Sequence, residues 1–558
     1  MLDKRYVVDI PEGSIIKSDR RVFWTIQKVY LKDKQYNHDK RRLIGKTLEA
    51  SRTKMYPNDN FIELFPEAYQ KAIGKKPAPS YQRIGMYLAV KTITEQLPLY
   101  STLTEVFGKE DADLILDYAM YQIIYATDVS QHFESSMEDK ALFSEKLRSD
   151  SYISQFFHHN ITEDKIDLFL ELWASRIIAF KHIHNVYMNV DGSNIDNEAE
   201  GVTIKELGHD KSGEGTTIVG IMYVVGPDGT GVFYHQYRGS IIDSKAVMYV
   251  YKFFKHLDAK IEGFCADRGF CTKDGVDLLR GMKCNFVLMM TSKPEGFTEA
   301  KNKIRDSIRN NMKKWIEGTE LFADTTCVKM FKNDTCDSYL HVLYDSAQSG
   351  IGIKSLLRQI NRAVDKARKN IKKKKEPGIP SELRQYVHLR SGRGPKTLVV
   401  EYEKIQEAIN DKGFHVLATS ENMKAKRAWE IYHVRDASET QYMFMKSELG
   451  LDVYRAGNDK SIAAKQFVAF IAGIIRNEIK LASIALIDQY NRSDWYSVPA
   501  IIQELETIRI KRLPGNEYAL VMDISERDEA MLNALKIPKT KLEECAISQN
   551  LRIKGTNR

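Results

Sequence analysis

Cysteine is scarce in this sequence, with six residues in a chain of 558. No two cysteines form a C-x-x-C pair, and no pair of histidines completes the spacing of a zinc site, so the sequence excludes a structural zinc ion of the common types. We expect free thiols in a reducing compartment and no structural disulfide. The cysteines are Cys265, Cys271, Cys284, Cys327, Cys336 and Cys545.

Long hydrophobic runs are also lacking. The longest, residues 467–475, is far shorter than the roughly 20 apolar residues that a membrane-spanning helix needs. Residues 1–10 contain no apolar segment of the kind that a signal peptide carries. We therefore expect no membrane partner, and a cytoplasmic protein associated with the nucleoid.

A strong excess of one charge is absent from the chain as a whole, since 83 Lys and Arg face 75 Asp and Glu. The cations are nevertheless concentrated. Residues 1–54 hold 14 cations against 7 acids, and residues 361–376 hold 8 against 2. Basic blocks on a near-neutral background favour contact with a polyanion, with a solvated lysine-rich face as the alternative. Within the second block we predict a DNA-facing loop at Lys372, Lys373, Lys374 and Lys375.

The length allows three or four domains. Alternating apolar runs with turn signals predict a small, basic, mostly β module over residues 1–65, which we expect to bind DNA. Its Trp24 and Tyr30 lie among lysines and arginines, which suits a nucleic-acid surface, but each can equally belong to the core. Apolar spacings of three and four predict a helical domain over residues 66–180, which either docks DNA or simply packs. Residues 488–558 are predicted to form a helical tail.

In residues 181–291 the apolar pattern changes from that of consecutive helices to that of strands joined by helices. The pattern predicts three antiparallel strands, a helix, a strand, a helix and a strand, with a hairpin turn at residues 226–229. That order is typical of an α/β fold with an RNase H-like core. Asp191 and Asp267 each end an apolar run that reads as a central strand. We therefore expect their carboxylates to lie close enough to share metal ions.

A third carboxylate lies far downstream. Tyr432, Arg435, Glu439 and Lys446 are spaced by three, four and seven residues, which places them within roughly 60° on one face of a helix. Solvated helix faces often mix such groups without a function, and that alternative stays open for this stretch alone. Two strand-end aspartates and one helical glutamate can converge on a pair of divalent metal ions.

These motifs resemble those of the DDE transposases of bacterial insertion sequences, in the group with a Tyr-x2-Arg-x3-Glu-x6-Lys signature. The resemblance covers roughly residues 180–480 and includes three motifs in the same order. It implies that residues 429–487 complete the RNase H-like core begun at 181–291. It also implies an inserted domain at residues 292–428, which accounts for the long spacing before Glu439.

The resemblance further implies a chemistry and a partner. Asp191, Asp267 and Glu439 would hold two Mg²⁺ ions, with Mn²⁺ able to substitute. The site would cleave double-stranded DNA at the ends of a mobile element and join the 3′-hydroxyl ends to target DNA, in a homodimer. Tyr432, Arg435 and Lys446 would hold the DNA end, and Arg268 would either contact phosphate or act as a structural cap.

Two other functions stay open. An RNase H-like nuclease would cut DNA without rejoining it. A domesticated DNA-binding protein would bind DNA and leave the acidic site unused.

Overall fold

A computed structural model gives the fold of this chain. The chain forms two compact units, Met1–Gln82 with Arg509–Val521, and Arg83–Ile508 with the residues from Met522 onward. Each unit is described by itself. The structure describes residues 6–31, 36–48, 51–73, 81–144, 146–183, 187–197, 199–207, 216–241, 243–259, 261–373, 375–390, 397–435, 444, 455–512, 518–520 and 523–555.

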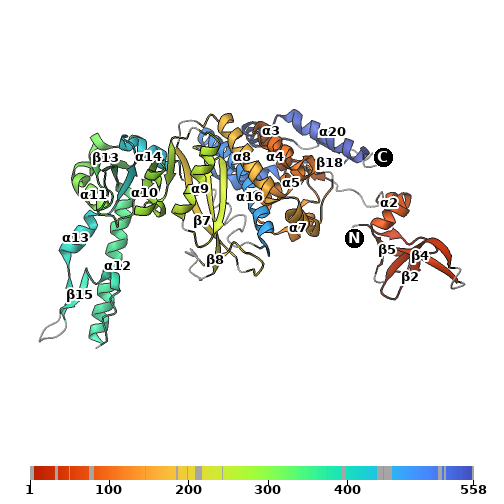
Figure 1. Cartoon of the computed structure of the whole chain (residues 1–558), viewed down its shortest axis with the longest axis horizontal. Coiled ribbons are helices and arrows are strands. Elements are labelled where there is room, and N and C mark those ends of the chain that lie inside the picture. The colour runs from red at the N-terminus through yellow and green to blue at the C-terminus, as the bar shows by residue number, and fades with distance from the viewer. Residues whose placement is uncertain are drawn as a thin grey trace. The chain divides into compact units, whose positions relative to one another are not determined.

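The first unit is built on a five-stranded antiparallel sheet (Figure 1). Its strands, in sheet order, are β1 (Val8–Asp9), β5 (Lys54–Pro57), β4 (Tyr36–Thr47), β3 (Arg21–Leu31) and β2 (Ile15–Ile16). Val22, Ile44 and Phe61 are buried together in its core. Helices α1 (Asp59–Leu64) and α2 (Pro66–Ile73) follow the sheet, so the module continues past residue 65.

The aromatic residues of β3 differ in their surroundings. Trp24 packs against Phe65, with ring centres 5.0 Å apart and nearly perpendicular planes, and borders the core. Phe23 instead lies near the charged ends of Lys17 and Arg21, which are 5.0 Å and 5.8 Å from its ring centre. Of the two interpretations of Trp24, packing therefore fits better. The side chain of Tyr30 lies outside the described residues.

The C-terminal part of the chain contributes a strand pair to this unit. β18 (Arg509–Arg512) pairs with antiparallel β19 (Tyr518–Leu520), and β6 (Tyr81–Arg83), whose first two residues belong to the same unit, lies beside β18. The tail expected to be helical thus contains a hairpin. Ile510 is buried between exposed Arg509 and Lys511, which is the two-residue alternation of a strand. Along the chain, the hairpin is preceded by α17 (Ser493–Tyr496) and α18 (Val498–Leu505) and followed by α19 (Glu526–Ala534) and α20 (Lys539–Gly555), all four of which belong to the second unit.

The second unit begins with a helical region. Its helices are α3 (Gly85–Gln96), α4 (Leu99–Phe107), α5 (Lys109–Tyr125), α6 (Phe133–Met137), α7 (Asp150–His159) and α8 (Glu163–Phe180). Of these, α3, α5, α7 and α8 pack against the long α16 (Asp459–Tyr490), whose first half is buried on nearly all sides. A buried ion pair joins the two, since Lys465 of α16 lies 3.0 Å from the carboxylate of Asp128. Of the helices in the described part of the chain, none has the length and apolar character to cross a membrane.

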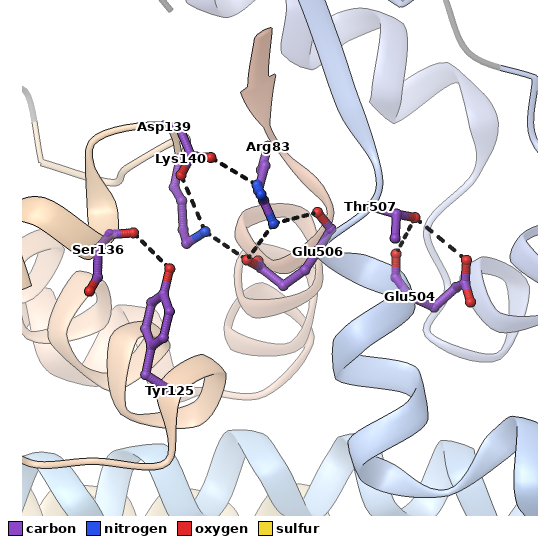
Figure 2. Close-up of polar contacts among 8 residues, drawn as sticks. All are labelled: Arg83, Tyr125, Ser136, Asp139, Lys140, Glu504, Glu506 and Thr507. Atoms are coloured by element: carbon purple, nitrogen blue, oxygen red, sulfur yellow. Dashed lines mark hydrogen bonds and ion pairs between the residues drawn. The ribbon is translucent and has the colours of Figure 1, made fainter.

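A second ionic cluster lies where the chain enters and leaves this unit (Figure 2). Lys140 is only 3% exposed, and its Nζ lies 2.6 Å from Oε2 of Glu506. Arg83 pairs with Asp139 at 2.9 Å and donates to the backbone carbonyl of Glu506 at 3.3 Å. The cluster therefore joins the end of β6, just before α3, to the loop after α6 and to the end of α18.

The largest sheet of the unit has nine strands, of mixed direction. In sheet order they are β10 (Gly231–Arg238), β9 (Thr217–Val225), β7 (Tyr187–Asp196), β11 (Gly263–Ala266), β12 (Asn285–Met289), β17 (Phe414–Thr419), β14 (Ser338–Asp345) and β13 (Leu321–Val328), with β8 (Glu206–Leu207) beside β9. β10, β9 and β7 are antiparallel, whereas β7, β11 and β12 are parallel. Helices α9 (Asp243–His256), α10 (Lys273–Gly281) and α11 (Glu295–Ile308) connect its strands. The predicted hairpin is confirmed as the β9–β10 connection, and the chain is a mixed α/β protein.

Three strands of the stretch 292–428 belong to the large sheet, and two others form a small sheet of their own. β17 pairs with β12, and β14 and β13 continue outward from β17, all antiparallel. The hydrogen-bonding edge of β12 is thus covered by a strand that follows it by more than a hundred residues. Only the middle of the stretch builds its own small core, from Leu356, Ile360 and Val387 among others. That part contains α12 (Ser346–Lys372), β15 (Val387–Arg390), β16 (Thr397–Val400) and α13 (Tyr402–Asn410).

Candidate active site

Two of the predicted acids lie in one row of the sheet. Ala266 of β11 lies directly opposite Val190 of β7, so the next residues of the two strands, Asp267 and Asp191, come level. Neighbouring strands are about 4.8 Å apart, and level residues on parallel strands point to the same face. The structure therefore places Asp191 and Asp267 at neighbouring positions on one face of the sheet, and both residues are partly buried.

The strand that carries Asp191 is longer than expected. β7 continues to Asp196, which still pairs with Ile218 of β9. Only the pairing with β11 stops next to Asp191, because β11 ends at Ala266 and the chain turns at residues 268–270. Asp191 therefore lies where two parallel strands separate, and not at the end of its own strand.

Helix α14 (Ala425–His433) covers the same face of the sheet. Its Ala428 and Ile431 pack with Cys265, Met289 and Leu417. Cys265 comes two residues before Asp267, so the period of two in a strand puts both on this face. The helix thus lies over β11 and the strands that follow it in the sheet, and it brings its C-terminal end toward Asp267.

Tyr432 makes the contact with the acid. Its hydroxyl donates a hydrogen bond to Oδ1 of Asp267 at 3.3 Å, and the side chain is 6% exposed. Burial raises the pKa of Tyr432 well above its ordinary value, so the phenol keeps its proton and remains a donor. The guanidinium of Arg435 lies 5.0 Å from the centre of the Tyr432 ring. Two members of the four-residue signature therefore lie together at Asp267.

The sequence predicted that the signature residues share one face of a single helix, but Tyr432 and Arg435 do not lie on the same helix. α14 ends at His433, and Arg435 lies just beyond it, with its amide bonded to the carbonyl of Tyr432 at 3.0 Å. Only Tyr432 of the signature therefore lies on α14. Glu439 and Lys446 lie outside the described residues. Between them Phe444 is buried, with the guanidinium of Arg476 4.3 Å from its ring centre.

Arg268 follows Asp267 directly and is exposed. Burial lowers the pKa of His415 on β17, and the positive charge of Arg268 lowers it further. The charge of Arg268 thus acts over the side of the sheet where β17 lies, and its exposure leaves it open to a ligand. The turn at 268–270 is closed by the amide of Phe270, which donates to the carbonyl of Asp267 at 3.0 Å. The backbone of Asp267, and not the arginine side chain, therefore caps this turn.

Two residues that the sequence reasoning missed line the same face. Tyr223 lies opposite Asp191 on β9, and its hydroxyl accepts a hydrogen bond from Gln466 of α16. Asn189 precedes Asp191 by two residues and is 1% exposed. Its amide oxygen has no hydrogen-bond partner among the residues that the structure describes. The two-residue period of β7 was the available signal for Asn189, whereas Tyr223 depends on strand register.

The donors at the site are oxygens. Asp191 and Asp267 offer carboxylates, and the amide of Gly192 holds Oδ1 of Asp191 at 2.9 Å. The nearby Cys265 is buried, which raises the pKa of its thiol and keeps it neutral. Such a donor set fits Mg²⁺ better than zinc. Within the described ranges, which leave out Glu439, no three His, Cys, Asp or Glu side chains gather around one point.

The predicted basic loop lies at the end of α12. Lys372 is the last residue of α12, and Lys372, Lys373 and Lys375 are exposed. Lys374 lies outside the described residues. These lysines belong to a different part of the unit from the row of acids, and the structure does not bring them to it.

Comparison with known proteins adds no assignment, because no family model and no curated protein matches the chain. The residues of the site and the resemblance of its motifs therefore carry the functional inference.

Proposed function

We propose that this protein is a DNA transposase that cleaves the ends of a mobile element and joins them to target DNA. The observation that supports this best is the row formed by Asp191 and Asp267, with Tyr432 hydrogen-bonded to Asp267. The order β10-β9-β7-β11-β12, three antiparallel strands followed by two parallel ones, supports an RNase H-like core.

Asp191 and Asp267 would hold two Mg²⁺ ions together with Glu439, and Mn²⁺ can take their place. The ions would supply activation of the attacking oxygen and stabilisation of the leaving oxygen. The oxygen-only donor set around Asp191 supports this choice. The carboxylates of the chain orient that site, and the protonated phenol of Tyr432 restrains the carboxylate of Asp267.

The cations near the site would hold phosphates. Arg435 and Lys446 are proposed to bind the DNA end, because guanidinium and ammonium groups both pair with phosphate oxygens. Arg268 is exposed next to Asp267 and is proposed to contact a phosphate as well. A homodimer on paired DNA ends and an association with the nucleoid complete the proposal.

The test is a cleavage and joining assay on duplexes that carry the repeats flanking the gene. Asp191→Asn, Asp267→Asn and Glu439→Gln keep shape and remove charge, so each should abolish Mg²⁺-dependent cleavage while DNA binding persists. Asp277→Asn is the matched control, because Asp277 is a half-exposed aspartate of α10 paired with Lys273 at 2.7 Å. It should cleave at the wild-type rate.

The outcomes separate the three candidate functions. Cleavage and joining that require all three acids support the transposase. Cleavage without joining would identify a nuclease, and DNA binding without either would identify a domesticated protein. A Lys446→Ala protein that is folded and joins ends at the wild-type rate would remove Lys446 from the site.

A further inference from the structure

Helix α12 carries a continuous basic face. Lys354, Arg358, Arg362 and Lys366 follow one another at intervals of four residues, and all four are exposed. At 100° per residue they span an arc of about 120°, and at 1.5 Å per residue they run for about 18 Å along the axis. Arg368, Lys369, Lys372 and Lys373 extend this surface to the end of the helix. We call the first four residues the α12 stripe.

The composition of this face differs from that of an ordinary solvated helix. Such helices alternate acids and bases at four-residue intervals, because opposite charges at that spacing stabilise the helix and like charges destabilise it. Here eight exposed cations share the face with a single acid, Asp365. None of the eight forms an ion pair within the described residues. The helix therefore carries a net repulsion among like charges that a single acid offsets only in part.

The opposite face holds the helix in place. Leu356, Ile360, Ala363, Val364 and Ala367 lie on it and are buried against the β15–β16 hairpin and α13. By the same helical geometry this apolar arc is centred roughly 170° from the cations. The apolar contacts thus fix the rotation of α12, and they direct the cations away from the small core.

We propose that the α12 stripe is a docking surface for the phosphate backbone of duplex DNA. This inference rests on the proposed function for its partner and deepens it. A straight, rigid row of cations suits a stiff duplex that presents phosphates along its length. A flexible single strand is bound chiefly by aromatic residues on which its bases stack, and residues 354–373 contain no aromatic side chain.

The test is the salt dependence of DNA binding. A protein with all four stripe residues changed to Gln keeps good helix formers at these positions. Each phosphate contact contributes about 0.9 to the slope of log affinity against log salt concentration. The variant should therefore flatten that slope by about 3 to 4 and lose at least roughly tenfold in affinity at low salt. Circular dichroism checks that the helix persists.

The matched control changes Lys303, Lys329, Lys332 and Lys404 to Gln. These are four exposed lysines of the same unit, none of them in an ion pair within the described residues. The control should keep nearly all of the slope lost by the stripe variant. If the slope of the stripe variant equals that of the wild type or of the control, the α12 stripe is an ordinary solvated helix face that does not bind DNA. An equal effect on single-stranded DNA would overturn the assignment to a duplex.

Binding is measured in EDTA on duplexes of arbitrary sequence, so it does not depend on cleavage. A wild-type protein that cleaves and joins DNA while the stripe variant binds normally would refute only the stripe. A stripe-dependent slope in a protein without cleavage activity would support the stripe and refute only the transposase.

Discussion

Lys140 is the residue whose loss should most weaken the point where the chain enters and leaves the second unit. Its Nζ lies 2.6 Å from Glu506 Oε2, and the two side chains are 3% and 12% exposed (Figure 2). Burial alone would lower the pKa of Lys140, but the carboxylate of Glu506 outweighs burial and holds that pKa above its ordinary value. The lysine is therefore charged in the folded protein. Lys140→Met keeps the aliphatic chain near the ring of Tyr125 and removes the charge.

The loss of stability in Lys140→Met depends on the carboxylate of Glu506, which stays buried without its lysine partner. Removing one partner of a buried ion pair typically costs about 3–5 kcal/mol, because the other charge stays buried. Glu506 keeps a weaker contact, since Nη1 of Arg83 is 3.7 Å from its Oε2. We therefore expect the lower limit, about 3 kcal/mol, for the free energy of local opening.

Hydrogen exchange measures this opening directly. The amides of Ile84 and Gly85 both donate to the carbonyl of Ile508, at 2.9 Å and 3.3 Å, next to the cluster. A loss of about 3 kcal/mol corresponds to exchange at these amides that is faster by roughly a hundredfold. Exchange in the hairpin of β9 and β10 should not change.

Two further variants control the experiment. Lys109→Met removes a lysine that is 75% exposed and lies 3.5 Å from Asp113. Because this ion pair is exposed to solvent, the variant should change exchange at Ile84 and Gly85 by less than about fivefold relative to the wild type. Adding Glu506→Gln to Lys140→Met removes the stranded carboxylate, so the double variant should recover much of the lost protection. Unchanged exchange at Ile84 in Lys140→Met, or exchange in the double variant that is no slower than in Lys140→Met, would refute the reasoning.

Two other predictions concern the site and the pH dependence of stability. Tyr432→Phe keeps the packed ring and removes the 3.3 Å hydrogen bond to Asp267, so it should raise the Mg²⁺ concentration for half-maximal cleavage by roughly tenfold without unfolding the protein. An unchanged Mg²⁺ requirement would show that the phenol does not restrain that carboxylate. Burial raises the pKa of Asp117 to about 7, against the pull of donors from Phe143 and Ser144. Between pH 4 and 7 the folded protein then holds a proton that the unfolded chain has released, so the contribution of Asp117 to stability falls as pH rises, by a few kcal/mol at most. Asp117→Asn cannot titrate, and the difference between its urea midpoint and that of the wild type should vary over this pH window; a constant difference would contradict the raised pKa.

The sequence by itself determined the order of elements in the core. A period of two or of 3.6 residues is a local property, so the strands around Asp191 and Asp267, the connecting helices and the hairpin at residues 226–229 follow from short stretches. The same local patterns singled out the two aspartates. They also place Asn189, two residues before Asp191, on the same face of the strand.

Tertiary structure decided which of these elements meet. Asp191 lies level with Asp267 because β7 and β11 pair in one particular register, and register depends on hydrogen bonds between segments more than seventy residues apart. The same holds for β17, which pairs with β12 and thereby joins β14 and β13 to the large sheet. The end of α14 at His433 sets Tyr432 on the helix and Arg435 beyond it, which helical spacing alone does not reveal. Periodicity states which face of an element is buried, whereas only the folded backbone determines its neighbour.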